Sequence, residues 1–198
     1  ITMNNFMRYK GQNVIEFSCD EKRNVTVDLG DNRVAKTTIA QAFRWVLYGA
    51  ELTERGKQQE DYQLLNNDIL AMMDANSKAD VTVELVAVDD EKRFRIKREI
   101  HYTRAYPQLI AKEFYKKVSL EISEKDDPNA GISVETEKIE EVIRELFPKN
   151  LSHYFLFDGE RWNDVTVNGV RENIKESVHT LTGLSAYQAA IWHLKDMG

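Results

Sequence analysis

The sequence feature that most constrains this chain is a near-complete phosphate-binding loop at residues 30–38, which read GDNRVAKTT. In a loop of the form G-x-x-x-x-G-K-[S/T], backbone N–H groups surround the phosphates of a nucleotide, the lysine reaches the β and γ phosphates, and the hydroxyl binds Mg²⁺. Gly30 takes the first position, Lys36 and Thr37 take the last two, and Ala35 stands where the second glycine belongs. The predicted nucleotide-binding residues are Gly30, Asp31, Asn32, Arg33, Val34, Ala35, Lys36, Thr37 and Thr38.

The residues on both sides of this loop support the interpretation. Val25, Val27 and Leu29 form a short apolar run before it. Apolar residues after the loop recur at helical spacing, at Ile39, Ala42, Phe43, Val46 and Leu47. The pattern predicts a strand, a glycine turn and a helix whose N-terminus faces the phosphates, with Gly49 as the helix stop. The alternative is an ordinary loop that contains Lys-Thr-Thr by chance.

Two residues of the loop depart from the usual pattern. Glycine permits positive φ and close approach of the phosphates, and the methyl group of Ala35 is the smallest possible intrusion. Arg33 replaces a glycine that is common in related loops, and its positive charge can instead interact with the phosphates. We therefore expect nucleotide binding with reduced affinity, and a slow loop remains an alternative.

Composition limits the class of protein. The 198 residues suffice for one domain, or one and a fraction, and 42% hydrophobic with 30% charged residues suits a soluble globular fold. No apolar run approaches the ~20 residues of a membrane span, and no signal peptide is recognisable. A single cysteine, Cys19, fits a reducing cytoplasm. The net charge of −6 argues against a wholly basic nucleic-acid binder, although a local basic face remains possible.

The middle of the chain reads as an antiparallel layer. Residues 81–85 and 94–102 alternate between apolar and polar residues around a polar turn, and residues 118–122 repeat the pattern. These patterns predict a hairpin and a third strand. A candidate strand at Val14, Ile15 and Phe17 and a short helix around residues 69–73 precede it. Residues 139–147 have amphipathic helical spacing that Pro148 should end. Residues 154–157 read as a buried strand that leads into Asp158.

These features together carry a family resemblance. The segments are NF at 5–6, GDNRVAKTT at 30–38, RWVLYG at 44–49, YFLFDGE at 154–160 and LTGLSAYQ at 181–188. Their order resembles the N-terminal half of the ATPase heads of SMC and double-strand-break-repair proteins. The sharper resemblance is to the DndD-like branch of bacterial DNA modification and anti-phage defence systems.

The resemblance implies an α/β fold, the N-terminal lobe of a P-loop ABC-type ATPase head. It would hold a mixed sheet around the loop, an antiparallel side sheet and the root of a coiled coil, with the lobe at residues 1–168 and the coiled coil from residues 169–198. Neither a signature motif nor an apolar strand that ends in Asp-Glu occurs in these residues. We therefore expect an incomplete head, with a C-terminal lobe supplied elsewhere, and ATP and Mg²⁺ as cofactors.

Asp158 falls where the glutamine loop of this family lies. A carboxylate there is a hard oxygen ligand suited to Mg²⁺, so the resemblance implies that Asp158 and Thr37 contact the metal and that Asp158 and Lys36 are catalytic. The alternative is that Asp158 and Gly159 only make a turn, which both residue types favour.

A second candidate surface is basic. Arg93, Arg95 and Lys97 stand among several cations between residues 92 and 104, where Glu99 is the sole acid. Such a patch could contact DNA phosphates, and the alternative is the solvated face of a strand.

The functional hypothesis is a cytoplasmic ATPase in which ATP-driven dimerisation of two heads is coupled to DNA binding or processing in repair, modification or defence. The expected partners are DNA, a second copy of the head and effector or modification subunits, with no membrane. One alternative is a nucleotide-gated scaffold with little turnover that regulates an effector nuclease. A small-molecule kinase is disfavoured because no substrate-side motif follows the loop.

Overall fold

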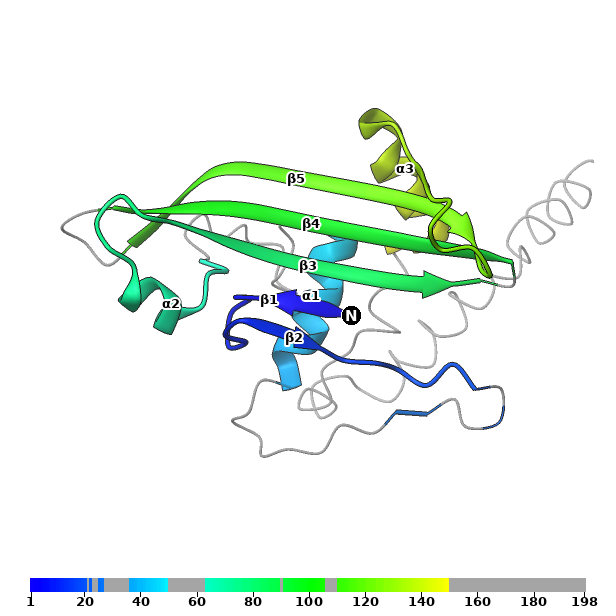
Figure 1. Ribbon diagram of the computed structural model, residues 1–198, viewed down its shortest axis with the longest axis horizontal. Helices are drawn as coiled ribbons and strands as arrows, with labels where there is room; N and C mark the ends of the chain where they lie inside the picture. The colour runs from blue at the N-terminus through cyan, green and yellow to red at the C-terminus, as the bar shows by residue number, and fades with distance from the viewer. Residues whose placement is uncertain are drawn as a thin grey trace, which may run out of the picture. The chain divides into compact units, whose positions relative to one another are not determined.

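The computed structural model describes residues 1–20, 22, 25–26, 36–49, 63–89, 91–105 and 110–149. Among them the strands are β1 (Thr2–Asn4), β2 (Gln12–Val14), β3 (Lys78–Val88), β4 (Lys92–Ala105), β5 (Ile110–Glu124) and β6 (Ile132–Ser133). The helices are α1 (Lys36–Tyr48), α2 (Asn67–Met72) and α3 (Thr136–Leu146). The described strands form one sheet in the order β2-β1-β3-β4-β5-β6, in which each neighbouring pair is antiparallel (Figure 1).

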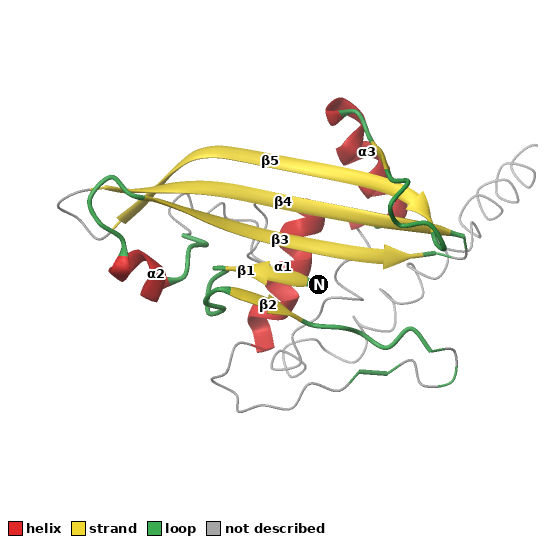
Figure 2. Cartoon of the chain, viewed as in Figure 1, coloured by secondary structure: helices red, strands yellow, loops and turns green. Residues whose placement is uncertain are grey.

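The long strands β3, β4 and β5 confirm the predicted hairpin and third strand. Val81 pairs with Ile100 and Leu85 with Ile96, so the apolar residues of the two alternating patterns share one buried face. A bulge on β5 opposite the step from His101 to Tyr102 shifts the register by one residue. Figure 2 shows these three strands running side by side along the whole described sheet.

The N-terminal strands were not well predicted. β1 was missed, although it pairs with β3 and its Met3 side chain is fully buried. β2 ends at Val14, so Ile15 and Phe17 of the predicted strand lie beyond it. A three-residue strand is too short to display the alternation from which strands are recognised.

Helix α1 packs against β3 and β4, which lie at the centre of the sheet (Figure 1). The apolar residues at helical spacing form the contact, and Trp45 and Val46 are buried. The ring of Trp45 lies 5.5 Å from that of Phe6, centroid to centroid. The helix ends before Gly49, whose φ of 77° is the left-handed conformation common after a helix, so the predicted stop is confirmed.

Helices α2 and α3 also follow the predictions from sequence. α3 ends at Leu146, before Pro148, and buries Ile139 and Ile143. It contacts β5. No helix in the described ranges is long and apolar enough to span a membrane.

Several predictions fall outside the described residues. They are the strand before the phosphate loop from residue 27 on, the loop itself up to residue 35, the strand at 154–157 and the coiled coil from residue 169. The predicted mixed sheet around the loop depends on these segments, and the sheet that the structure describes is antiparallel.

Candidate nucleotide-binding site

The amino end of α1 is the described part of the predicted phosphate site. Lys36, the lysine of the loop pattern, is the first helical residue, and Thr37 is exposed while Thr38 is buried. The first turn contains no acidic residue. Because the first N–H groups of a helix lack partners within the helix and its dipole is positive at this end, this end suits an anion. The first turn, which has no acidic residue, suits the phosphates, and the exposed Thr37 can offer its hydroxyl to Mg²⁺.

The remaining predicted site residues are not brought together by the structure. Residues 30–35 and Asp158 lie outside the described residues, as do residues 181–188. Of the predicted metal ligands, Thr37 alone is described. In the part of the chain that the structure describes, no group of three His, Cys, Asp or Glu side chains is placed to hold a metal ion.

The carboxyl end of α1 is held by Arg98 from strand β4. The Arg98 Nε donates to the carbonyl oxygen of Val46 at 2.8 Å, and Nη2 donates to that of Leu47 at 3.3 Å. The same Nη2 donates to Glu140 Oε1 on α3 at 2.7 Å. Sequence analysis missed this residue because it placed Arg98 among the other cations of the hairpin. The signal was its position in the alternation, on the same face as Ile96 and Ile100.

Tyr102 connects β4 to the segment that precedes α2. Its side chain is 1% exposed, and its hydroxyl accepts a hydrogen bond from the Leu64 N–H at 3.3 Å and donates one to Glu113 Oε1 at 3.3 Å. Burial raises the pKa of the Tyr102 hydroxyl well above its usual value. Burial also raises the pKa of Tyr48, the last residue of α1. Both hydroxyls are therefore neutral at physiological pH.

A polar cleft of about 520 Å³ lies between the turn after β1 and the start of α2. Its lining residues are Met7, Arg8, Gln63, Leu65, Asn66, Asn67 and Asp68. Asn66 shapes this wall: its Oδ1 accepts from the N–H groups of Asp68 and Ile69, and its Nδ2 donates to the Met7 carbonyl oxygen at 2.8 Å. The volume suits a small polar ligand.

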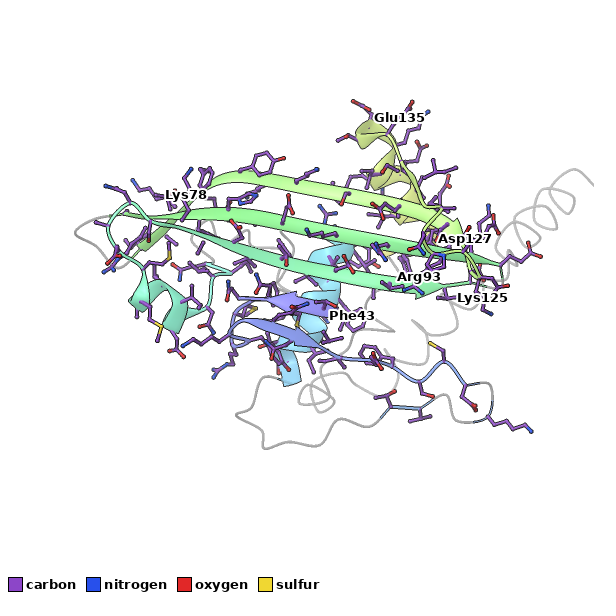
Figure 3. All side chains as sticks on the ribbon, in the orientation of Figure 1. Phe43, Lys78, Arg93, Lys125, Asp127 and Glu135 are labelled. Atoms are coloured by element: carbon purple, nitrogen blue, oxygen red, sulfur yellow. The ribbon has the colours of Figure 1, made fainter. Side chains whose placement is uncertain are left out.

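Arg93, Arg95 and Lys97 lie on the face of the sheet opposite to α1, and Figure 3 labels Arg93 near the start of β4. Arg95 lies between two carboxylates, with Nε 4.0 Å from Glu84 Oε1 and Nη1 3.5 Å from Glu121 Oε2. Lys97 Nζ lies 3.1 Å from Glu99 Oε2. These half-exposed ion pairs reduce the net positive charge of the face, and DNA binding there stays a prediction.

Comparison with known proteins assigns the chain to a family. The AAA domain family AAA_23 matches residues 1–197, which include the phosphate loop and α1. The chain belongs to this family. It is therefore an AAA-type ATPase domain of the SMC-like N-terminal head type, a class with the capability to bind and hydrolyse ATP, and the resemblance seen in the sequence is confirmed at this level. None of the curated proteins compared with the chain matches it.

Proposed function

We propose that this chain is the ATP-binding lobe of an SMC-like head in which ATP-driven dimerisation is coupled to DNA binding or processing. The observation that carries the proposal is the start of α1 at Lys36, the lysine of the loop pattern, within a chain that matches the AAA family over residues 1–197. We propose that the chain acts in DNA repair, DNA modification or anti-phage defence, and that it belongs to the DndD-like branch of these proteins.

Each residue of the site has a defined task in this proposal. The Lys36 ammonium neutralises charge on the β and γ phosphates, and backbone N–H groups of residues 32–38 hold the phosphates. The Thr37 hydroxyl, which is exposed on the first turn, ligates Mg²⁺. Asp158 lies on the metal side and orients the attacking water. Bound Mg²⁺ supplies the positive charge that stabilises the transferring phosphoryl group.

The partners in this proposal are a second copy of the head, DNA and effector or modification subunits. The second copy is proposed because the chain belongs to the family of SMC-like heads, in which two heads dimerise on binding ATP. The support for DNA is weaker, since Arg95 and Lys97 each face a carboxylate.

A nucleotide-gated scaffold is the second candidate, and Ala35 favours it. A methyl group in place of the second glycine leaves room for ATP but can displace the γ-phosphate from its reactive position. In that case the protein binds ATP, hydrolyses it very slowly and organises an effector nuclease. Steady-state turnover by the complete protein separates the two candidates.

The test is the Lys36→Ala variant of the complete protein, compared with Lys138→Ala as a control. Lys138 is an exposed lysine of α3 that pairs with Glu135, outside the proposed site. We expect Lys36→Ala to weaken ATP binding at least tenfold in calorimetry and to abolish turnover, while its circular dichroism and melting temperature match the wild type. Equal ATP affinity and turnover in wild type and Lys36→Ala would refute the assignment of the phosphate loop.

A further inference from the structure

Arg98 lies on β4 at a position where the apolar–polar alternation of the strand predicts an apolar side chain. On the face of β4 that packs toward α1, its neighbours in the alternation are Ile96 and Ile100, which are both buried. The side chain of Arg98 is only 13% exposed. A guanidinium that loses most of its water is stable only where other groups accept its hydrogen bonds. The hydrogen-bond partners of the Arg98 guanidinium therefore indicate its structural role.

Two of these partners are carbonyl oxygens at the carboxyl end of α1. The last four carbonyl groups of a helix have no partner within the helix. At this end the Trp45 carbonyl accepts from the Gly49 N–H at 2.9 Å, and the carbonyls of Val46 and Leu47 accept from Arg98. The positive charge also lies at the negative end of the helix dipole. Arg98 thus caps α1 from a different element of the fold.

The third partner is on another helix. Arg98 Nη2 donates to Glu140 Oε1 at 2.7 Å, and Glu140 belongs to α3, the described element that precedes Asp158 in the chain. One side chain on β4 therefore joins the carboxyl end of α1 to α3. The Glu140 side chain is 49% exposed, so the two carbonyl bonds of Arg98 are the better-shielded part of this connection.

We propose that Arg98 is a positioning residue for the ATP site, an inference that rests on the proposed function. By fixing the carboxyl end of α1 to β4 and α3, Arg98 sets the axial position of the helix whose amino end carries Lys36 and Thr37. A helix of 13 residues is a rod about 20 Å long, so a shift along its axis at one end moves the other end equally. A displacement of about 1 Å at reacting groups costs on the order of 100-fold in rate.

The test measures ATP affinity and turnover in the complete protein for Arg98→Met, Arg98→Lys and Glu140→Gln. Arg144→Met is the matched control, since Arg144 is an exposed arginine of α3 whose Nε donates to the Glu140 backbone carbonyl within the same helix. All measurements are made at a temperature where circular dichroism shows each variant fully folded. Hydrogen exchange of the α1 amides gives a second readout that needs no nucleotide.

We expect Arg98→Met to lower kcat at least tenfold and to weaken ATP binding at least threefold, with faster hydrogen exchange at the carboxyl end of α1. Arg98→Lys keeps the charge and should recover part of both losses. Glu140→Gln keeps the cap and loosens only the connection to α3, so its kcat should fall about threefold. Arg144→Met should stay within twofold of wild type in kcat and affinity.

Several outcomes would overturn the proposal. If folded Arg98→Met retains ATP affinity and kcat within twofold of wild type, Arg98 stabilises the fold and nothing more. If Arg98→Met does not fold, Glu140→Gln decides, because unchanged kcat, affinity and α1 exchange in that variant refute the connection to α3. Lys36→Ala, measured alongside, separates the two levels. If Lys36→Ala loses ATP binding while Arg98→Met keeps wild-type affinity and kcat, the role of Arg98 is refuted and the proposed function stands. If the wild-type protein binds no ATP, both the proposed function and this inference are refuted.

Discussion

Replacing Asn66 by alanine should destabilise the domain far more than its place on the wall of a polar cleft suggests. The Asn66 side chain makes three hydrogen bonds, to the N–H groups of Asp68 and Ile69 at 3.0 and 3.2 Å and to the Met7 carbonyl oxygen at 2.8 Å. The residue is 5% exposed, and removal of its amide leaves all three partners without these bonds. It both caps α2 and connects this helix to the turn after β1.

The magnitude follows from two separate losses. Removing an N-cap side chain costs about 1 kcal/mol, within a range of 0.5–2 kcal/mol. Leaving the Met7 carbonyl without its donor costs about 1–3 kcal/mol more. Asn66→Ala should therefore lower the free energy of unfolding by about 2–4 kcal/mol. Asn66→Asp retains an oxygen for the cap but loses the donor to Met7, so it should show roughly half of that loss.

Urea denaturation at 25 °C, followed by circular dichroism, measures these differences. Asn67→Ala is the control, because Asn67 is exposed and, among the residues that the structure describes, its Oδ1 accepts one bond, from Gln63 Nε2 at 3.4 Å. It should stay within about 0.5 kcal/mol of wild type. A loss below about 1 kcal/mol for Asn66→Ala, or wild-type stability of Asn66→Asp, would show that the connection between α2 and the turn at Met7 does not stabilise the fold.

Two further predictions concern Tyr102 and the basic face. Burial raises the pKa of Tyr102 above its usual value of 10.0, so the stability it contributes is fully present below about pH 10 and is lost as the pH rises through the higher pKa of the folded state. In urea titrations, Tyr102→Phe should lower stability at pH 7 by about 1–3 kcal/mol, since the Leu64 N–H loses its acceptor, and should flatten the decline above pH 10; an unchanged alkaline slope would contradict this. Reversing the charges of Arg93, Arg95 and Lys97 together should weaken duplex DNA binding for all sequences alike and flatten its salt dependence in fluorescence anisotropy; wild-type affinity with the same salt slope would leave this face as an ion-paired, solvated surface.

The sequence by itself determined the elements whose signals are local and periodic. Strands β3, β4 and β5 contain alternating runs at residues 81–85, 94–102 and 118–122, so the position of each of these strands could be predicted before any contact was known. Helix α3 has its apolar stripe and a proline at its end, and α1 has Gly49 after its last turn. The loop pattern at residues 30–38 was enough to predict a nucleotide site and, with the other segments, the family that the comparison confirmed.

Tertiary structure alone decided the features that depend on partners distant in the chain. β1 and β6 are three and two residues long, too short for a periodic signal, and they become strands only by pairing with β3 and β5. Arg98 stands at an inward position of the β4 alternation, but the hydrogen-bond partners of Arg98 and Asn66 are known only once the fold brings the backbone groups of other elements to them. Arg98 bonds to the carbonyl oxygens of Val46 and Leu47, which lie 52 and 51 residues earlier in the chain. No sequence pattern links residues so far apart, because the packing of β4 against α1 determines which side chain reaches these carbonyls.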